Sequence, residues 1–238
     1  TSVPSFQKGN YANKFAGSKD SADLLLGISQ ILSRRMIIQV NYSFSYAEGY
    51  LNDPYKVLSA ISPLVGRPIL RHDGDELVPA LIYEGRPNSR QKQSLFGRLK
   101  YRFDRGTLGF SYRYMKDDWK IDSSTVDLRY RWDLPSSSYI EPHVRFYTQT
   151  AAGFYTTSLI DGKPLPKFAS ADYRLGDFEG VTVGVKYGRI LANGNEWNVR
   201  LESYSTAGNG PNSIVYPDLD AVIFQMSYNF ALGGRRSP

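Results

Sequence analysis

The sequence predicts an all-β fold, an antiparallel transmembrane up-and-down β-barrel of about 10–12 strands, from three observations. In the stretch 35–47, RMIIQVNYSFSYA, apolar side chains occupy every second position from Met36 to Tyr46, and a period of two places them on one face of a strand. Such alternation outlasts the roughly 5–6 residues of a soluble strand and reaches the roughly 9–11 that a tilted membrane-spanning strand needs. Short and long connections also alternate along the chain, which is typical of a barrel with periplasmic turns at one end and extracellular loops at the other.

The composition agrees with this fold. With 41% hydrophobic residues and a mean hydropathy of −0.40, the chain has no apolar run of the roughly 18 residues that a spanning helix needs. It nevertheless contains 18 Tyr, 12 Phe and 3 Trp, and aromatic rings of this kind are favoured where lipid meets water. The absence of cysteine excludes disulfides and thiolate sites, and the net charge of +6 is scattered rather than clustered, so we expect no nucleic-acid partner.

The first two predicted strands, Ser21–Leu32 and Arg35–Ala47, form a hairpin on the turn Ser33-Arg34-Arg35. The long connection 48–90 follows, in which Asp53-Pro54 predicts a short helix over Lys56–Ile61. A connection of this length is unusual in a compact soluble domain and expected of an external barrel loop.

The later strands keep the same alternation, and Pro142 predicts a strand end or a bulge because it lacks a backbone donor. These strands are Ser94–Phe103, Leu108–Tyr114, Thr125–Trp132, Ile140–Tyr147, Val181–Gly188, Trp197–Glu202 and Val222–Phe230. The turns near 105, 135 and 193 are short, whereas the loops 115–123, 148–179 and 205–217 are longer.

The resulting count of nine strands is odd, whereas bacterial single-chain barrels have even numbers. A further strand is therefore predicted in Thr1–Lys19, in 166–178 or in sequence before Thr1. The chain opens without Met or an apolar leader, so we expect a removed signal peptide or additional N-terminal sequence. Residues 1–238 are predicted to form one barrel domain, with 48–90 and 148–179 as its long extracellular loops.

Five runs resemble a family of bacterial outer-membrane β-barrels known only as a domain of unknown function. They are GYLNDPYK (Gly49–Lys56), EGRPNSR (Glu84–Arg90), SYRYMKDDW (Ser111–Trp119), EPHVRFYTQTAAGFY (Glu141–Tyr155) and FASADYRL (Phe168–Leu175). The resemblance covers most of residues 45–230 and implies the outer membrane of a Gram-negative bacterium. Family members are usually longer, which implies strands before Thr1, and their genes lie near flavin-transferase and small lipoprotein genes, which implies an envelope redox context. The family supplies no catalytic residues.

On the strand face opposite the lipid, mostly charged side chains are predicted to line the lumen: Arg98, Lys100, Arg102, Arg113, Asp127, Arg129, Arg131, Glu141, His143, Arg145, Lys186, Arg200 and Glu202. The basic excess favours an anion-attracting channel, and the alternative is that Arg–carboxylate ladders fill a narrow barrel and make it rigid. His143, between Glu141 and Arg145 on one face, could be a general base, a metal ligand or a hydrogen-bonded lumen residue. Because no spacing marks a nucleophile, we expect no enzyme activity, metal or cofactor.

The long loops combine aromatic, proline and small polar residues, and loops on a rigid scaffold often bind partners. The predicted partner-binding residues are Tyr50, Leu51, Asp53, Pro54, Tyr55, Arg86, Pro87, Trp119, Phe154 and Tyr155. These loops could also fold over the barrel mouth and plug it. The sequence favours an outer-membrane scaffold or anchor, embedded in outer-membrane lipids, for a surface lipoprotein, redox protein or appendage. The alternative is a narrow porin-like channel with an anion-favouring lumen.

Overall fold

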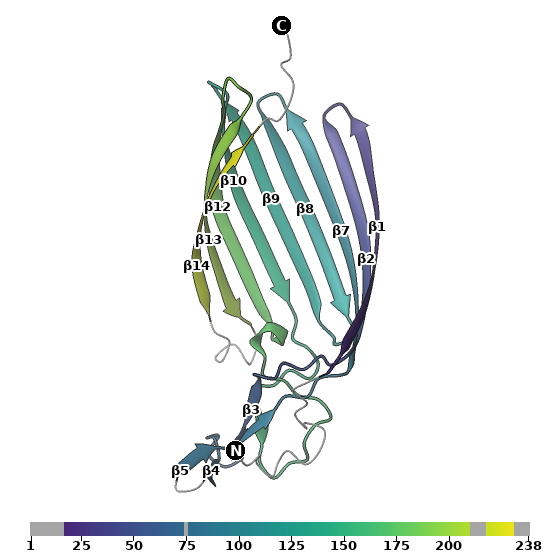
Figure 1. The fold of residues 1–238 in the computed structure, drawn as a ribbon, viewed down its shortest axis with the longest axis vertical. Coiled ribbons are helices and arrows are strands. Elements are labelled where there is room, and N and C mark those ends of the chain that lie inside the picture. The colour runs from purple at the N-terminus through teal and green to yellow at the C-terminus, as the bar shows by residue number, and fades with distance from the viewer. Residues whose placement is uncertain (1–16, 74–75, 210–217, 231–238) are drawn as a thin grey trace.

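The computed structural model describes residues 17–73, 76–209 and 218–230. One large antiparallel sheet of nine strands dominates it, and a small loop subdomain lies beyond one end of that sheet (Figure 1). In sheet order the strands are β1 (Lys19–Ser33), β2 (Met36–Gly49), β7 (Ser89–Phe103), β8 (Gly106–Asp117), β9 (Asp122–Leu134), β10 (Ser138–Gln149), β12 (Phe178–Ile190), β13 (Glu196–Gly208) and β14 (Leu219–Asn229).

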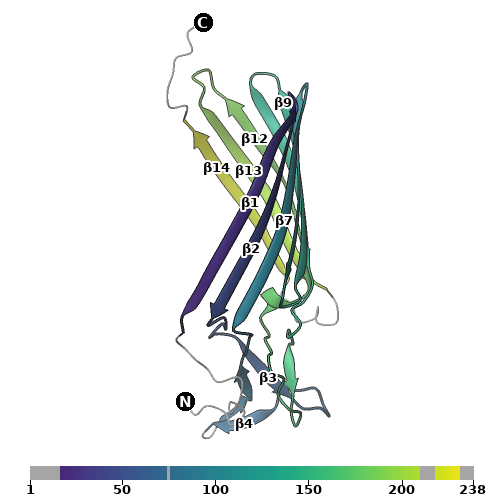
Figure 2. The same ribbon diagram turned by 90° about the vertical axis from the view of Figure 1, so that its right-hand side faces the viewer.

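The sheet is an up-and-down meander in which every strand pairs antiparallel with the next strand of the sheet. The turns between β1 and β2, β7 and β8, β9 and β10, and β12 and β13 all lie at one end, and the other connections, three of which are longer, lie at the opposite end (Figures 1 and 2). All nine predicted strands are thus confirmed. The predicted alternation of connection lengths holds except at β8–β9, where the predicted loop 115–123 is only the connection 118–121, which is shorter than the turn 191–195 between β12 and β13.

The strands are longer than the predicted segments, and most of the extension lies at the loop end. For example, β7 begins at Ser89 rather than Ser94, and Arg90 and Lys92 pair with Ala47 and Ser45 of β2. Polar residues fill both faces of the β7 extension, so the apolar alternation that marks the strand in the sequence is lost there while the backbone ladder continues.

The sheet is open in the described residues, because β1 and β14 are its two edges and do not pair with each other. The predicted total of ten to twelve strands is therefore not reached in this part of the chain. Segment 166–178, one of the predicted places for a further strand, contributes the 3-10 helix η2 (Tyr173–Leu175) before β12 begins. The other place within the chain, Thr1–Lys19, lies almost entirely outside the described residues.

The loop subdomain contains the remaining strands. The strands β11 (Ser158–Ile160), β3 (Val57–Ile61) and β6 (Leu81–Tyr83) form a three-stranded sheet, and β4 (Leu70–Asp73) pairs with β5 (Glu76–Pro79) in a hairpin. The two sheets lie at the end of the molecule farthest from the short turns (Figure 1). Residues from both long connections, 48–90 and 148–179, are joined in this subdomain, since β11 pairs in parallel with β3.

The predicted helix over Lys56–Ile61 is wrong, because this segment forms β3. Leu58 and Ala60 are buried while Val57 is exposed, so burial alternates with a period of two. Asp53 instead organises a turn, in which its carbonyl accepts from the Lys56 amide (3.1 Å) and its Oδ1 from the Tyr55 amide (3.0 Å). An Asp at the start of a turn and an Asp at a helix N-cap give the same local sequence signal.

Pro142 lies inside β10 without a bulge. It is a register partner of Val185 on β12, whereas pairing with β9 is interrupted between Ile140 and His143 and resumes in the same register. The missing amide of Pro142 thus interrupts the ladder on one side only, which its lack of a donor explains. The predicted strand end or bulge is wrong.

The outward face of the large sheet is apolar and exposed, whereas the exposed face of a sheet in a soluble protein is polar. Its exposed side chains include Val40, Leu128, Val144, Val183 and Leu201. The opposite, polar face is the more buried one, as the side chains of Thr182, Asn198, Glu202 and Thr206 show. An exposed apolar face of this extent marks a surface that another apolar medium covers.

Aromatic side chains border this apolar face at both ends. Near the short turns, ring pairs join Tyr101 to Phe103 and Tyr187 to Trp197, with centroids 4.6 and 5.6 Å apart. Towards the loops, tyrosine hydroxyls reach polar groups on the loop side: Tyr112 with Ser124 at 3.0 Å and Tyr114 with Asp122 at 2.7 Å. Two aromatic girdles around an apolar band are typical of outer-membrane β-barrels.

Within the described residues, no helix has the length and apolar character required to cross a membrane.

Candidate functional site

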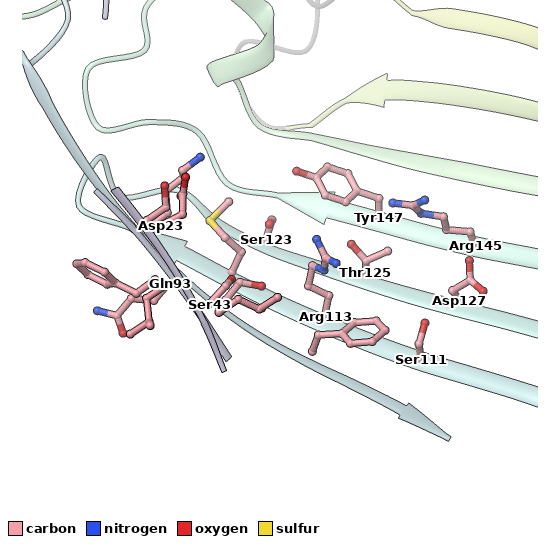
Figure 3. Close-up of a pocket in the computed structure, with 18 residues that line it drawn as sticks. Asp23, Ser43, Gln93, Ser111, Arg113, Ser123, Thr125, Asp127, Arg145 and Tyr147 are labelled. Carbon is pink, nitrogen blue, oxygen red and sulfur yellow. The ribbon is translucent and has the colours of Figure 1, made fainter. Parts of the chain in front are cut away.

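The predicted lumen residues share one face of the large sheet, which we call the polar face. The register aligns them in rungs across neighbouring strands, such as Arg113–Thr125–Tyr147 and Ser111–Asp127–Arg145 on β8, β9 and β10. Three hollows of about 750, 450 and 580 Å³ indent this face. Figure 3 shows the first of them, with Arg113, Thr125 and Arg145 projecting from adjacent strands.

A carboxylate–imidazole–carboxylate chain crosses the middle of the polar face. His143 Nδ1 lies 2.7 Å from Glu202 Oε1, and His143 Nε2 lies 3.0 Å from Asp127 Oδ2. The imidazole is buried, and Arg129 (3.1 Å to Asp127) and Arg200 (3.8 Å to Glu202) extend the chain on either side. The neighbours predicted for His143, Glu141 and Arg145, are not its partners. Of the three roles considered for His143, this geometry agrees with the hydrogen-bonded residue.

Gly184 makes this chain possible. It lies on β12 between His143 and Glu202, which are its register partners on β10 and β13. A Cβ at position 184 would lie 2.4 Å from Glu202 Cγ, so only glycine lets the glutamate side chain cross β12 to reach the imidazole. Gly188 acts likewise for Tyr139, whose ring covers it and whose hydroxyl bonds Glu196 Oε1 at 2.5 Å.

Several other predicted lumen residues form ion pairs on the same face. Lys186 Nζ lies 2.9 Å from Glu141 Oε1. Asp133 forms ion pairs with both Arg102 (2.6 Å) and Arg131 (3.1 Å). These pairs match the rigid-ladder alternative for part of the face. They do not use all of its basic residues.

Four of the predicted lumen cations, Arg98, Lys100, Arg113 and Arg145, are exposed and form no ion pair with any described residue. Arg98 and Lys100 line the hollow of about 450 Å³, and Arg113 and Arg145 line the one of about 750 Å³. The polar face therefore keeps cationic side chains that are available to solutes.

The loop subdomain has two small apolar cores. Leu58, Ile82, Leu159 and Ala169 form one of them, drawing on β3, β6 and β11. The other consists of Trp119, Ile121, Ala152 and Leu175, with Phe154 and Tyr155 packed against it. Both cores combine residues from distant loops, so the long connections fold together rather than hanging independently.

A buried ionic cluster ties the two longest connections together at a single point. Arg86 Nη2 donates to Glu84 Oε2 (2.9 Å) and to Asp172 Oδ2 (2.8 Å), and Ser170 Oγ donates to Glu84 as well. Arg174 donates hydrogen bonds to Asp172 through Nε and Nη2, and its Nη2 also lies 2.7 Å from Asp53 Oδ2. The runs GYLNDPYK, EGRPNSR and FASADYRL thus meet in one network.

Asp172 is ionised within this network. Its side chain is 1% exposed, and this burial raises its pKa. Hydrogen bonds from the side chain and backbone of Arg174, and the charges of Arg174 and Arg86, outweigh that burial and hold the pKa below its usual value. The hydrogen bond to Asp172 raises the pKa of the Arg174 guanidinium further, so both partners remain charged.

A second cluster fastens the subdomain to the rim of the large sheet. Arg90 of β7 reaches Asp117 Oδ2 on β8 through Nε (2.8 Å) and Nη2, and its guanidinium lies over the Trp119 ring at 4.4 Å. Trp119 Nε1 donates to the Ser89 carbonyl at 2.8 Å. Gln149 completes the attachment by donating to the carbonyls of Arg174 (3.0 Å) and Gly176 (2.7 Å).

The predicted partner-binding residues fall into two groups. Asp53, Arg86, Trp119, Phe154 and Tyr155 are engaged in these clusters and cores, and burial raises the pKa of Tyr155. Leu51 is partly buried and packs against the same core as Phe154 and Tyr155. Tyr55 is 90% exposed, whereas Tyr50, Pro54 and Pro87 are partly buried.

Sequence reasoning missed the structural use of Glu84, Asp117, Asp172 and Arg174. Their signal was present, because each is a charged residue inside one of the runs EGRPNSR, SYRYMKDDW and FASADYRL. The exposed apolar face of the hairpin β4–β5 was also missed, because its alternation spans only four residues a strand.

Among solved structures the chain is similar to outer-membrane proteins. It matches the in-vitro folded and the outer-membrane expressed OmpT of Vibrio cholerae with TM-scores of 0.46 and 0.47 at 8% and 9% identity. These matches cover 88% and 94% of this chain and 56% and 58% of OmpT, so the chain spans a little over half the length of that protein. A bacterial polysaccharide outer-membrane secretin matches with a TM-score of 0.32 at 11% identity, covering 87% of this chain and 77% of the secretin. No curated protein matches the sequence.

The fold that emerges is an antiparallel sheet like that of outer-membrane β-barrels, with its apolar face outward and its charged face inward. The model of the family described as protein of unknown function, DUF3570, matches residues 3–230, which is nearly the whole chain. This chain belongs to the DUF3570 family.

Proposed function

We propose that this protein is an outer-membrane scaffold whose loop subdomain binds a protein partner at the cell envelope, such as a surface lipoprotein. The observation that carries the proposal is an exposed apolar face on the hairpin β4–β5. Leu70 and Pro79 are register partners, and Leu77 lies on the same face two residues before Pro79. Leu70 and Leu77 are both more than half exposed.

An isolated two-stranded hairpin is marginally stable in water. This hairpin extends from a subdomain that buries other apolar residues in two cores, and Leu64, which precedes the hairpin in the sequence, is 92% exposed. An apolar surface held on a fastened platform costs little further ordering when a partner covers it. A protein partner suits this surface better than a small ligand, because it is a projecting face rather than a cavity.

Site-specific photo-crosslinking tests the proposal. A photo-reactive residue at Leu77 in the full-length protein in native membranes should give one crosslinked protein band, and the double variant Leu70→Ser/Pro79→Ser should lose it. Ile160 is the matched control position, because it is an exposed apolar residue of the same subdomain on a different strand. No band at Leu77, or equal bands at Leu77 and Ile160, would argue against the scaffold.

A second candidate function rests on a different observation. The unpaired cations Arg98, Lys100, Arg113 and Arg145 on the polar face favour a conduit for anions, if that face encloses a water-filled lumen. Planar-bilayer recordings of the purified full-length protein separate the candidates. Stable, anion-selective conductance steps support the conduit. A bilayer without conductance, together with a specific crosslink at Leu77, supports the scaffold and rejects the conduit.

A further inference from the structure

The hollow of about 750 Å³ on the polar face collects cations and hydroxyl groups (Figure 3). Lys92, Arg113 and Arg145 line it from β7, β8 and β10, and none of them forms an ion pair with a described residue. Hydroxyl groups surround them on the same hollow: Ser43, Ser45, Ser94, Ser111, Ser123, Thr125 and Tyr147. Charged donors and neutral donors therefore line one hollow, together with apolar residues such as Leu24 and Phe96.

The register places the two arginines of the hollow on either side of one threonine. Arg113 is the partner of Thr125 on β9, and Arg145 lies on β10 two residues from Tyr147, the partner of Thr125 on its other side. Adjacent strands are about 4.8 Å apart, so β8 and β10 are separated by roughly 10 Å, a gap that two long arginine side chains can close around a small anion. The Arg113 guanidinium also lies over the Phe96 ring at 5.4 Å, which orients it before any ligand binds.

The acids of the hollow do not cancel these charges. Asp127 is committed to Arg129 and His143, while Asp23 lies on the edge strand β1 and makes no ion pair with a described residue. Three cations against one committed and one free carboxylate leave a positive excess. Cations without partners on one surface attract an anion from water.

We propose that this hollow binds a small tetrahedral oxyanion of the phosphate class between Arg113 and Arg145. Guanidinium groups donate bidentate, charge-assisted hydrogen bonds to such oxygens, and the Thr125 hydroxyl adds a neutral donor. The inference rests on the second candidate function only in requiring that water reach the polar face. It does not require that ions pass through.

Isothermal titration calorimetry of the full-length protein, purified in detergent micelles at low salt, tests the site with inorganic phosphate. Wild type should bind phosphate saturably, and Arg113→Gln and Arg145→Gln should each weaken binding about tenfold or more, as expected for loss of a charge-assisted hydrogen bond. Arg98→Gln is the matched control, since Arg98 is an unpaired arginine of the same face that lines the hollow of about 450 Å³ instead. Its affinity should stay within about twofold of wild type, because salt screens distant exposed charges.

Three results would overturn the inference: no saturable phosphate binding by folded wild type, an equal loss in Arg98→Gln, or tighter binding of succinate than of phosphate. Near-UV circular dichroism confirms that each variant is folded. The conductance recordings give an independent answer on the conduit. Phosphate binding without conductance would uphold the site and reject the conduit, and anion conductance without saturable binding would do the reverse.

Discussion

At the residue scale, the charged side chains of this protein have two different uses. Several of those in the loop subdomain are buried and paired, as in the network of Glu84, Arg86 and Asp172. Those of the polar face are in part unmatched, as are Arg98 and Arg113. Removing one member of a buried network leaves an uncompensated charge, whereas removing an exposed cation changes mainly the local potential.

Arg86→Gln should open the loop subdomain while leaving the large sheet folded. Two buried carboxylates, Glu84 and Asp172, would lose their shared partner, which typically costs about 3–5 kcal/mol. Hydrogen exchange should rise over 48–90 and 148–179 and stay unchanged over β7–β10. The control is Arg35→Gln, which removes an ion pair with Asp104 whose side chains are 56% and 82% exposed and which should cost less than about 1 kcal/mol. Equal exchange in both variants would contradict the clamping role.

The subdomain should also loosen in acid. The folded pKa of Asp172 lies below its unfolded value of about 3.9, so its stabilising effect is present above that pH and is lost as the pH falls further, towards the folded pKa. Limited proteolysis of the long loops should therefore be constant from neutral pH down to about 4 and accelerate below it. The loops of the Asp172→Asn variant should be cleaved faster than those of wild type at neutral pH, and their cleavage should accelerate less in acid. A pH profile identical to that of wild type would exclude Asp172 as the titrating group.

Gly184→Ala should disturb the imidazole chain, because the new methyl would meet Glu202 Cγ at 2.4 Å and the Leu201 carbonyl oxygen at 2.7 Å. Overpacking of this kind costs about 1–3 kcal/mol. Gly109→Ala is the matched control on the same face, since the nearest atom to its Cβ would be the Arg129 carbonyl oxygen at 3.9 Å. Thermal unfolding followed by gel mobility should separate the two variants, and equal midpoints would show that Glu202 relaxes without cost.

At the element scale, each strand of the large sheet is sorted along its length as well as across its faces. On the outward face of β9, Val126 and Leu128 give way to Ser124 and Asp122 towards the loops. The apolar part of the strand predicts lipid contact, and the polar part predicts contact with water or headgroups.

Leu128→Arg and Ser124→Arg test this division on one strand. An arginine in the middle of the apolar band should cost about 2–4 kcal/mol, and one near its border about 0–1 kcal/mol. Chemical unfolding from lipid vesicles measures both. Similar penalties at both positions would mean that the outward face of β9 does not meet a bilayer.

Elements of this kind could be predicted where their periodicity is long. Nine strands and their short turns follow from alternation over six residues or more, as in Val181–Gly188. Strand β3 was mistaken for a helix because five residues carry too little periodicity to outweigh the Asp53-Pro54 signal. The ionic cluster could not be derived, since it joins Asp53, Arg86 and Asp172, whose proximity depends on how two distant loops pack.

At the scale of the whole molecule, strand number and direction conflict with simple closure. In a meander of nine antiparallel strands, β1 and β14 run in the same direction, so joining them directly would need a parallel ladder unlike every other pair of the large sheet. Edge strand β1 exposes Leu25, Ile28 and Ile31 on both of its faces, and an unpaired apolar edge of this length invites pairing with a further strand.

Disulfide crosslinking of engineered cysteine pairs can test whether the two edge strands are neighbours. Native cysteines do not interfere, because the chain has none. The pair Ser203→Cys/Val222→Cys joins register partners of β13 and β14 and should crosslink on oxidation in membranes. The pair Leu26→Cys/Phe224→Cys has one cysteine on each edge strand, β1 and β14, and should not form a crosslink. Efficient crosslinking between the edges would show that the nine strands close on themselves.

The lengths of the strands have a consequence for reach. Strands of 12–15 residues rise about 40–50 Å, or roughly 30–38 Å when tilted by about 40°, while the apolar band of an outer-membrane barrel is about 25 Å tall. The polar ends of β7, β8 and β9 would then form a pedestal of about 10 Å above the hydrocarbon. A hairpin carried on such a pedestal would stand clear of the headgroups, and a macromolecule approaching this end of the sheet would meet it before it met the membrane.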